Sequence, residues 1–260
     1  QHRMRPEVSK LLVPAIYPSL LNADNVFDRP DINGLTSNVF FISHGHLQNP
    51  IDDDKSHSNE HEAKFIMQLA RYLVLQGYSP LEITVLTPYF GQLSLLKKEL
   101  PHIPECTGMR ISIVDNYQGE ENEIILLSLV RSNKEGNIGF LKTENRVCVA
   151  LSRARCGFYM IGNLDQLSSR SKLWTKMKQT LTEMNSVSDE LTLRCQNHPD
   201  NLRRVRTGKD ILFQSPDGGC REKCSVILTR CGHLCQLWCH VQDSGHEDYR
   251  CPLPCERTCG

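Results

Sequence analysis

Cysteine and histidine residues gather at the C-terminal end of this 260-residue chain, at spacings typical of metal ligands. Zinc prefers four Cys or His ligands in a tetrahedron, and a short spacing lets two ligands come from one turn of chain. C-x3-C occurs five times after position 219, and CGH and CH occur once each in the same stretch. The candidate ligands are Cys220, Cys224, Cys231, His233, Cys235, Cys239, His240, His246, Cys251, Cys255 and Cys259.

These residues are enough for two closed Zn²⁺ sites, and Cys195 with His198 in the sequence CQNH are possible members of a third. The spacing does not decide which ligands share an ion. The segment has few aliphatic residues, so we expect it to need metal in order to fold. Cys106, Cys148 and Cys156 lie far from this group and are interpreted as ordinary buried or inert thiols.

A second group of polar residues follows short apolar runs in the first 165 residues. ISIV is followed by Asp115 to Glu121, ITVL by Thr87-Pro88-Tyr89 with Gln92, and the run RVCVAL by Ser152-Arg153-Ala154-Arg155. The chain opens with QHRMRP. Taken alone, each stretch also has a structural interpretation, and an isolated SRAR is typical of a solvated helix end or an ion pair.

Strands and helices alternate in this region, which predicts a parallel sheet covered on both faces. Such sheets bind ligands at the carboxyl ends of their strands, where we expect the polar residues to lie. A helix is predicted to start at an Asn59 cap, with Glu62 completing a capping box, and to end at Gly77. Strands are predicted at 39–43, 83–87, 111–114, 123–130 and 157–162, with helices within 88–100 and up to about 152.

Composition bounds the class of protein. The 30 basic and 30 acidic residues give a formal net charge of zero, so no global field draws the chain to polyanions. No window of the sequence approaches the roughly 20 apolar residues of a membrane helix.

We divide the chain into a domain at residues 1–165, a polar linker at 166–193 with a helix in LWTKMKQTLTEM, and a Cys/His-rich module at 194–260. We expect the chain to be a fragment in which this module is incomplete at its C-terminal end.

The order and spacing of the motifs resemble the C-terminal RecA-like domain of up-frameshift-type superfamily 1 RNA helicases, relatives of senataxin. The resemblance covers roughly residues 1–165 through QHRMRP, TVLTPYFGQ, SIVDNYQGEENEIILLSLVRSN, IGFL and NRVCVALSRARCGFYMIGN. The cysteine-rich segment behind it is similar to helicase-like members that carry X-box-factor-type (NF-X-type) zinc fingers. The fold class is therefore expected to be α/β, a RecA-like parallel sheet with helices on both faces, followed by a small irregular zinc-finger module.

The resemblance implies roles in ATP hydrolysis for several residues. Arg153 matches the family's arginine finger, Arg3 a second phosphate-contacting arginine, and Glu121 the carboxylate that contacts the ribose or the hydrated Mg²⁺. Phosphoryl transfer depends on such positioned cations, and a guanidinium stays charged. Gln118 and Gly119 are expected to shape the turn before Glu121. Arg155 is assigned either to ATP binding or to a structural ion pair.

RNA contact is implied for Thr87, Pro88, Tyr89 and Gln92, which match a motif near the family's nucleic-acid track. Packing against the next helix is an equal alternative for Tyr89. His2 departs from the commoner tyrosine, which leaves nucleotide selectivity at this position open. No G-x-x-x-x-G-K-[ST] phosphate cradle occurs, so ATP and Mg²⁺ would be held through a first RecA-like domain, and this chain alone is expected to be inactive.

Two classes of function follow. The first is the second motor half of an ATP-dependent RNA helicase or translocase in RNA surveillance, silencing or antiviral pathways, with zinc fingers that bind RNA or protein. The second is an RNA clamp and zinc-dependent scaffold without unwinding. Both predict single-stranded RNA and protein partners and an intracellular, cytoplasmic location. A disulfide framework belongs to small proteins of oxidising compartments and does not suit a helicase half.

Overall fold

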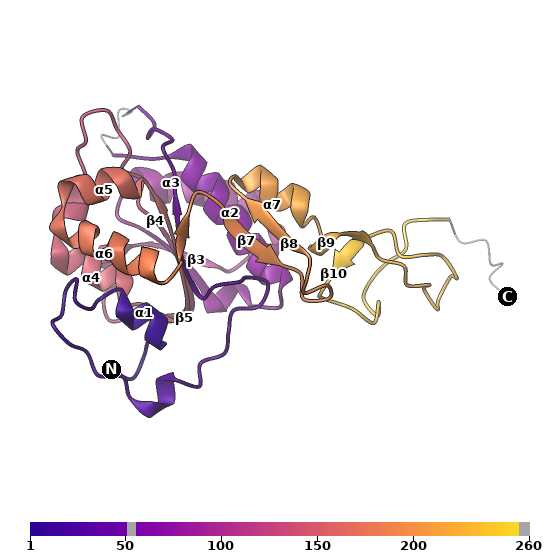
Figure 1. Ribbon diagram of the computed structural model, residues 1–260. Coiled ribbons are helices and arrows are strands. Elements are labelled where there is room, and N and C mark those ends of the chain that lie inside the picture. The colour runs from indigo at the N-terminus through magenta and orange to yellow at the C-terminus, as the bar shows by residue number, and fades with distance from the viewer. Residues whose placement is uncertain (51–55, 255–260) are drawn as a thin grey trace.

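Residues 1–50 and 56–254 are described by the computed structural model, so Cys255 and Cys259 lie outside the described residues. The central element is a six-stranded sheet with the order β3-β2-β4-β5-β1-β6, in which every neighbouring pair is parallel. Figure 1 shows this sheet between helices, with the C-terminal segment extending away from one end. The strands are β1 (Val39–Ser43), β2 (Ile83–Thr87), β3 (Arg110–Ile113), β4 (Asn122–Ser128), β5 (Ala154–Gly162) and β6 (Val187–Ser188). The expected α/β fold is confirmed.

Alternate residues of the strands enter two separate cores, one on each face of the sheet. In β5, Tyr159 belongs to one core and Phe158 to the other, and in β4 Leu126 and Leu127 divide in the same way. Successive side chains of a strand point to opposite faces, so a strand buried on both faces is apolar throughout. This explains the continuous apolar runs in the sequence.

Each face is covered by its own helices. One core contains residues of α2 (Glu60–Leu75) and α3 (Phe90–Glu99). The other contains residues of α1 (Pro6–Lys10), α4 (Glu144–Leu151), α5 (Leu164–Arg170) and α6 (Lys172–Glu183). Short 3-10 helices lie at Asp24–Val26, Pro80–Glu82, Leu100–His102, Pro104–Cys106, Val114–Tyr117 and Gly139–Lys142.

The start of α2 agrees with the sequence in one respect and differs in another. Asn59 is the N-cap, and its side chain accepts from the backbone N–H of Glu62 over 3.2 Å. The expected capping box is absent, because the backbone N–H of Asn59 donates to Gln92 instead, over 2.7 Å. The Glu62 side chain is thereby left for other partners. Gly77 follows the helix end at φ +107°, as the sequence predicts.

The segment predicted to be a linker, 166–193, is helical as expected but is not separate from the sheet. Trp174 and Leu181 of α6 are buried in the second core, and the Trp174 indole donates to the carbonyl of Leu141 over 2.9 Å. β6 adds a strand beside β1. The polar composition of α6 was misleading, because a helix needs only one apolar stripe to dock.

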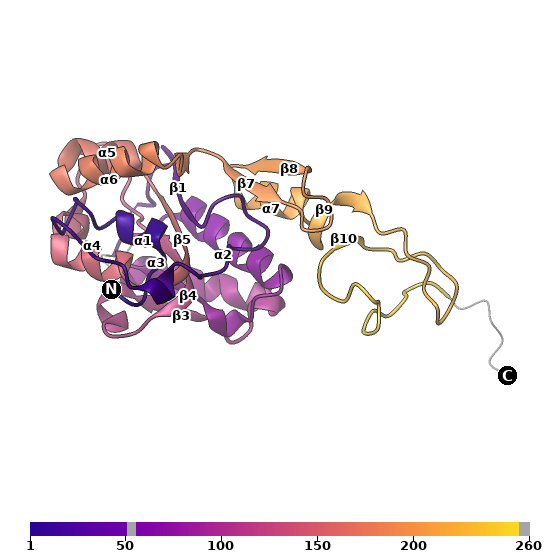
Figure 2. The ribbon, with the colours of Figure 1, turned by 60° about the horizontal axis from the view of Figure 1, so that its bottom comes forward.

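The expected boundary at 194 also falls inside a packed unit. β7 (Leu191–Arg194) pairs antiparallel with β8 (Leu202–Val205), and α7 (Gly208–Gln214) packs beside α2. Leu193 and Ile211 share the core of α2. Beyond them β9 (Gly218–Lys223) and β10 (Trp238–His240) form a short antiparallel pair, which Figure 2 shows at the base of the extended segment.

No helix among the described residues is long and apolar enough to cross a membrane.

Candidate functional site

Three charged side chains from separate segments meet at one edge of the sheet. Glu121 precedes β4, Arg155 lies in β5, and Arg3 lies before α1. The Nε atoms of both arginines donate to the Glu121 carboxylate, that of Arg155 over 2.7 Å. Arg155 also contacts Glu123 over 3.0 Å, so the ion pair considered for it is present.

This group lies at the amino ends of β4 and β5 and not at the carboxyl ends where we expected it. The chain leaves β3 at Ile113 and crosses back through 114–121 before it enters β4. The strand β5 also begins earlier than predicted, at Ala154, and therefore contains Arg155. The expectation failed because a turn of eight residues is long enough to return along the sheet.

Arg153 lies in the turn between α4 and β5, beside this group. Its guanidinium donates to the carbonyls of Val149 (2.7 Å) and Glu120 (3.1 Å) and to the hydroxyl of Ser152 (2.8 Å). All three acceptors are neutral, and Arg153 forms no salt bridge within the described ranges 1–50 and 56–254. Burial lowers its pKa, and the nearby charge of Arg3 lowers it further. The Arg153 charge is thus held in place without a carboxylate partner.

A hollow of about 430 Å³ opens beside Arg3 and is lined by Gln1, His2, Met4 and Glu121 as well. The side chains of Arg3 and Glu121 are each 30% exposed, so a ligand in the hollow can reach both. Gln1 fixes the loop, since its carboxamide oxygen accepts from the backbone N–H groups of Arg3 (3.0 Å) and Met4 (2.7 Å). We did not assign this role to Gln1 from the sequence, although the residue opens the QHRM motif.

The arginine pair keeps Glu121 ionised. Partial burial raises the pKa of this carboxyl, but hydrogen bonds and charges from Arg3 and Arg155 outweigh burial and bring the pKa below its ordinary value. Gln118 and Gly119 lie exposed in the preceding turn. Gly119 has φ +87°, a conformation that other residues adopt only with strain.

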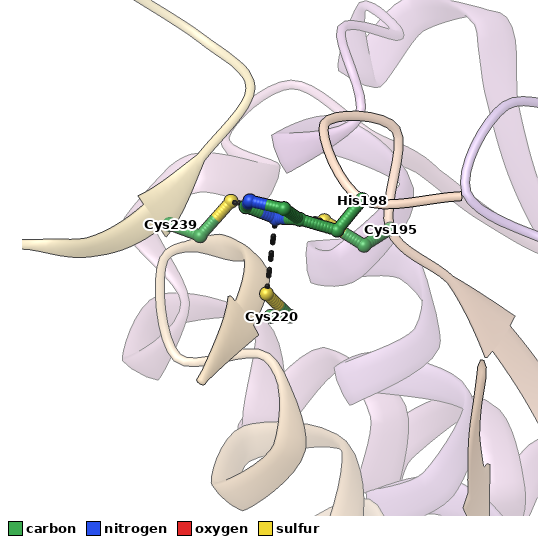
Figure 3. A group of neighbouring side chains, drawn as sticks. All are labelled: Cys195, His198, Cys220 and Cys239. Atoms are coloured by element: carbon green, nitrogen blue, oxygen red, sulfur yellow. Dashed lines mark hydrogen bonds between the residues drawn. The ribbon is translucent and has the colours of Figure 1, made fainter. Parts of the chain in front are cut away.

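The cysteines and histidines of the C-terminal segment form three clusters in which the ligand atoms lie within 4.8 Å of one another. The first cluster contains Cys195, His198, Cys220 and Cys239 (Figure 3). Its sulfur atoms Cys195 Sγ and Cys239 Sγ are 3.7 Å apart, and His198 Nδ1 lies 3.3 to 3.6 Å from the three sulfurs. Bonds of about 2.3 Å to sulfur and 2.0 Å to nitrogen place tetrahedral ligands about 3.3–3.8 Å apart, so the donor set fits Zn²⁺.

The second cluster contains Cys224, Cys235, His240 and His246. His246 Nε2 lies 3.3 Å from Cys224 Sγ and 3.1 Å from His240 Nε2, and Cys235 Sγ lies 4.0 Å from His240 Nε2. The third cluster, Cys231, His233 and Cys251, provides three ligands among the described residues. The clusters interleave, because the C-x3-C pairs 220/224 and 235/239 are each divided between the first and the second.

Hydrogen bonds orient the histidines of the first two clusters. His240 Nδ1 lies 2.7 Å from the carbonyl oxygen of Gln242, and His246 Nδ1 lies 3.0 Å from that of Ser244, which leaves both Nε2 atoms free to bind an ion. His198 Nε2 lies 3.5 Å from Glu222 and leaves Nδ1 for the first cluster. Such contacts fix the tautomer of a ligand histidine.

No disulfide joins the ten cysteines that the structure describes. The Cys195–Cys239 sulfur separation of 3.7 Å is far above the roughly 2.05 Å of a covalent bond. Within these residues the sulfur positions therefore suit metal binding and not a disulfide framework.

Comparison with known proteins decides the family. A family profile described as an AAA domain matches residues 1–165. The chain belongs to the up-frameshift-type family of superfamily 1 helicases. In this helicase chain, the residues from Arg3 to Arg155 described above all lie within the matched domain.

Its curated relatives include proteins with zinc fingers. The chain is 47% identical over 259 residues to the Mus musculus protein named NFX1-type zinc finger-containing protein 1, covering 99% of this chain and 13% of the relative. A Caenorhabditis elegans homolog of that protein is 35% identical over 268 residues, covering 100% and 11%. The Schizosaccharomyces pombe protein named helicase required for RNAi-mediated heterochromatin assembly 1 is 37% identical over 184 residues, covering 70% and 18%. The chain thus spans a small part of each relative.

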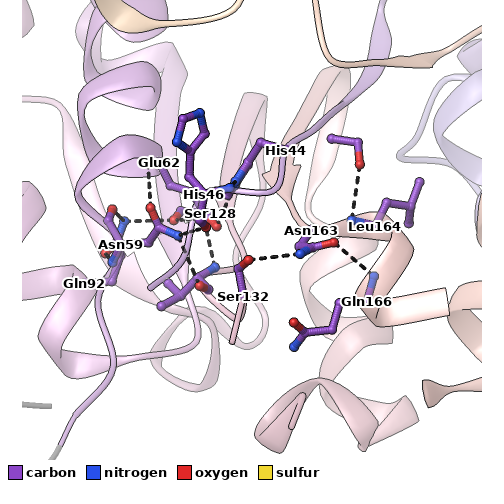
Figure 4. Close-up of polar contacts among 12 residues, drawn as sticks. His44, His46, Asn59, Glu62, Gln92, Ser128, Ser132, Asn163, Leu164 and Gln166 are labelled. Carbon is purple, nitrogen blue, oxygen red and sulfur yellow. Dashed lines mark hydrogen bonds and ion pairs between the residues drawn. The ribbon is translucent and has the colours of Figure 1, made fainter. Parts of the chain in front are cut away.

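The carboxyl ends of the helicase strands carry a buried polar network that the sequence did not reveal. The Glu62 side chain is fully buried and accepts from the Ser128 hydroxyl (2.6 Å), the Val130 backbone N–H (2.8 Å) and, across 3.1 Å, meets His44 Nε2 (Figure 4). Val130 has φ +70°, which is rare for a β-branched residue. Glu62 therefore holds a strained turn directly after β4, and this turn ends the strand two residues before the predicted position.

The residues expected to bind RNA lie at this same edge, but most of them are buried. Thr87 and Gln92 are 0% exposed, Pro88 is buried and Tyr89 is half-buried. Gln92 joins α3 to Asn59 and to the hydroxyl of Ser128 (2.9 Å). In this structure Gln92 positions its neighbours and does not reach solvent, so the sequence-based assignment of direct RNA contact does not hold for it.

Proposed function

We propose that the chain is the second motor half of an ATP-dependent RNA helicase or translocase. One observation carries the proposal: Arg153 is held by neutral acceptors beside a solvent-reachable Arg3–Glu121 pair. A cation without a carboxylate partner is suited to meet a phosphate, whereas a salt-bridged one is already neutralised. The name of the Schizosaccharomyces pombe relative, a helicase, supports the same class of function.

Each charged residue at this edge of the sheet has a distinct task in this proposal. Arg153 would act as the finger opposite the γ-phosphate, and Arg3 would contact a second phosphate oxygen. Glu121 would accept from a ribose hydroxyl or from the hydration shell of Mg²⁺, because it is ionised. Arg155 would orient Glu121 and would not touch the nucleotide, since its guanidinium is shared between two carboxylates, whereas that of Arg3 pairs with Glu121 alone.

The metal clusters complete the proposal. We infer that the first and second clusters each hold one Zn²⁺ and that the module serves contacts with RNA or protein partners in a reducing, cytoplasmic setting. Zinc would tie together four ligands at each cluster, which in the first cluster come from three separate chain segments. The module is also tied to the helicase body: Gln76 at the end of α2 donates to the Gly218 carbonyl over 2.6 Å, and Gln196 donates to Gln76 over 3.1 Å.

The test uses a longer chain that includes a first RecA-like domain with its phosphate cradle. ATP hydrolysis is measured with and without single-stranded RNA, and zinc is counted on the same sample. We expect RNA-stimulated turnover with at least two zinc ions per chain. RNA binding without turnover would reject the motor and favour the clamp. Arg110→Ala is the matched control for an Arg153→Ala variant of this chain, because Arg110 forms a surface pair with Glu120 and does not line the hollow.

A further inference from the structure

The strand β9 presents two different faces. Cys220 belongs to the first cluster, and Glu222 on the same side contacts His198. Because successive side chains of a strand alternate, Arg221 and Lys223 point to the opposite side. Both side chains are exposed. The strand thus carries a metal ligand and the carboxylate beside His198 on one face, and two cations on the other.

Two aromatic side chains lie beside these cations. Trp238 of β10 pairs directly with Lys223, whose Nζ lies 3.7 Å from the centre of the indole ring. Phe213 at the end of α7 lies 3.8 Å from the Arg221 guanidinium carbon, and Trp238 lies 5.4 Å from it. We call Phe213, Arg221, Lys223 and Trp238 the basic–aromatic face. Figure 2 shows that its elements α7, β9 and β10 lie at the junction of body and extended segment.

The charges of this face are not satisfied by acids. Among residues 1–50 and 56–254, neither Arg221 nor Lys223 forms a salt bridge. The neighbouring arginines differ, since Arg204 pairs with Glu190, and Arg206 with Asp189 and Glu190. The aromatic part is open as well: the Phe213 side chain is 59% exposed, although a ring of this size is usually covered.

We propose that the basic–aromatic face binds a single-stranded polynucleotide, with a base stacked on the aromatic and guanidinium planes and its phosphates beside Lys223. Proteins that bind single strands without reading sequence combine aromatic platforms with adjacent cations. A guanidinium plane accepts a stacked base as an aromatic ring does. An acidic protein segment would use the cations but has no need of the exposed ring, so the face favours a polynucleotide.

This inference deepens the proposed function, because it assigns the RNA contact of the zinc module to a defined surface outside the ATP hollow. It rests on the proposed function only for the assignment of the polynucleotide as RNA. Binding at this face requires no ATP, so the two proposals can fail separately.

The binding test uses the zinc-loaded 260-residue chain and an oligouridylate of about 12 nucleotides, within the range of single-strand site sizes. Phe213→Ala should weaken binding about tenfold. Lys223→Glu should weaken it by a similar factor at low salt and reduce the salt dependence by about one phosphate contact. Arg230→Glu is the control, because it makes the same charge change at an exposed position without a stacked ring. Zinc content of every variant verifies that the module is folded.

Tryptophan fluorescence provides an independent reading. The chain has two tryptophans, of which Trp174 is fully buried and Trp238 is half-buried at the face. Saturating oligouridylate should quench Trp238, and Trp238→Phe should abolish the quenching while zinc is retained. A duplex RNA of the same length should quench weakly, since its bases are already stacked.

The proposal is overturned if Lys223→Glu and Arg230→Glu weaken binding equally, if Trp238 fluorescence does not respond, or if the oligouridylate does not bind. In the longer chain, loss of binding at this face with RNA-stimulated ATP hydrolysis intact would leave the motor proposal standing. Conversely, if an Arg153 variant loses ATP hydrolysis but still binds the oligouridylate at the basic–aromatic face, the motor proposal is affected and the proposal for this face still holds.

Discussion

Replacing Glu62 by alanine should destabilise the helicase fold severely, although Glu62 contacts neither nucleotide nor metal in our account. Its fully buried carboxylate serves the Ser128 hydroxyl at 2.6 Å, the Val130 N–H at 2.8 Å and His44 at 3.1 Å. The truncation leaves all three groups buried and without this partner. It also releases the strained Val130 turn at the end of β4.

The size of the effect follows from these contacts. Each buried donor left without an acceptor costs about 1–3 kcal/mol. The three losses share one site and are not additive, so we expect Glu62→Ala to lower the free energy of unfolding by about 3–5 kcal/mol. That is a large fraction of the roughly 5–15 kcal/mol that stabilises an ordinary domain.

The assay is urea unfolding followed through Trp174 in a Trp238→Phe background, because Trp174 lies in the core on the other face of the sheet and reports on loss of the whole fold. Glu60→Ala is the control, because Glu60 lies on the same helical turn but forms only an exposed pair with Lys64. Its unfolding midpoint should stay close to that of the parent chain. A change below about 1 kcal/mol in Glu62→Ala would refute the reasoning, since one unsatisfied donor alone should exceed it.

Three further outcomes are expected. Cys224→Ser should release one zinc ion per chain in a metal assay while Cys148→Ser releases none, and equal zinc contents would contradict the second cluster. Burial and the two neighbouring imidazoles lower the pKa of His61 from 6.5 to about 4, so between these pH values the unfolded chain binds more protons than the folded chain. The urea midpoint should therefore fall as the pH drops from about 6.5 towards 4, and it should fall less steeply in His61→Gln. Parallel pH dependences of the two midpoints would disprove this. Gly119→Ala should cost about 1 kcal/mol in the same assay because of φ +87°, and a stabilised variant would contradict the turn geometry.

The sheet was predictable because its strands are apolar on both faces. The strands around Phe41, Val85 and Leu126 lie where the apolar runs predict them, with ends shifted by a few residues. The docking of α6 was not predictable from its polar composition. The apolar stripe with Trp174 identifies a docking surface only when the sheet face that receives it is known.

The pairing of metal ligands could not be read from spacing. Cys220 lies within β9 and Cys224 directly follows the strand, and because four residues of extended chain span about 13 Å, a single tetrahedron cannot include both. Cys195 and Cys239 are distant in sequence and meet because β7 and β10 converge. The role of Glu62 likewise depends on a residue distant in sequence. The spacing from Asn59 predicts a capping box, but the backbone N–H of Asn59 donates to Gln92 and leaves the Glu62 side chain for other partners.

The most direct test of the motor is the rate of ATP hydrolysis by Arg153→Ala in the longer chain. With saturating single-stranded RNA, we predict that the rate falls by about 10³-fold or more while nucleotide binding changes little, as for loss of an arginine finger. The Arg110→Ala control should hydrolyse ATP at the parent rate. Hydrolysis by Arg153→Ala at the parent rate would contradict the account, because no other guanidinium at this edge is free of a carboxylate partner among the described residues.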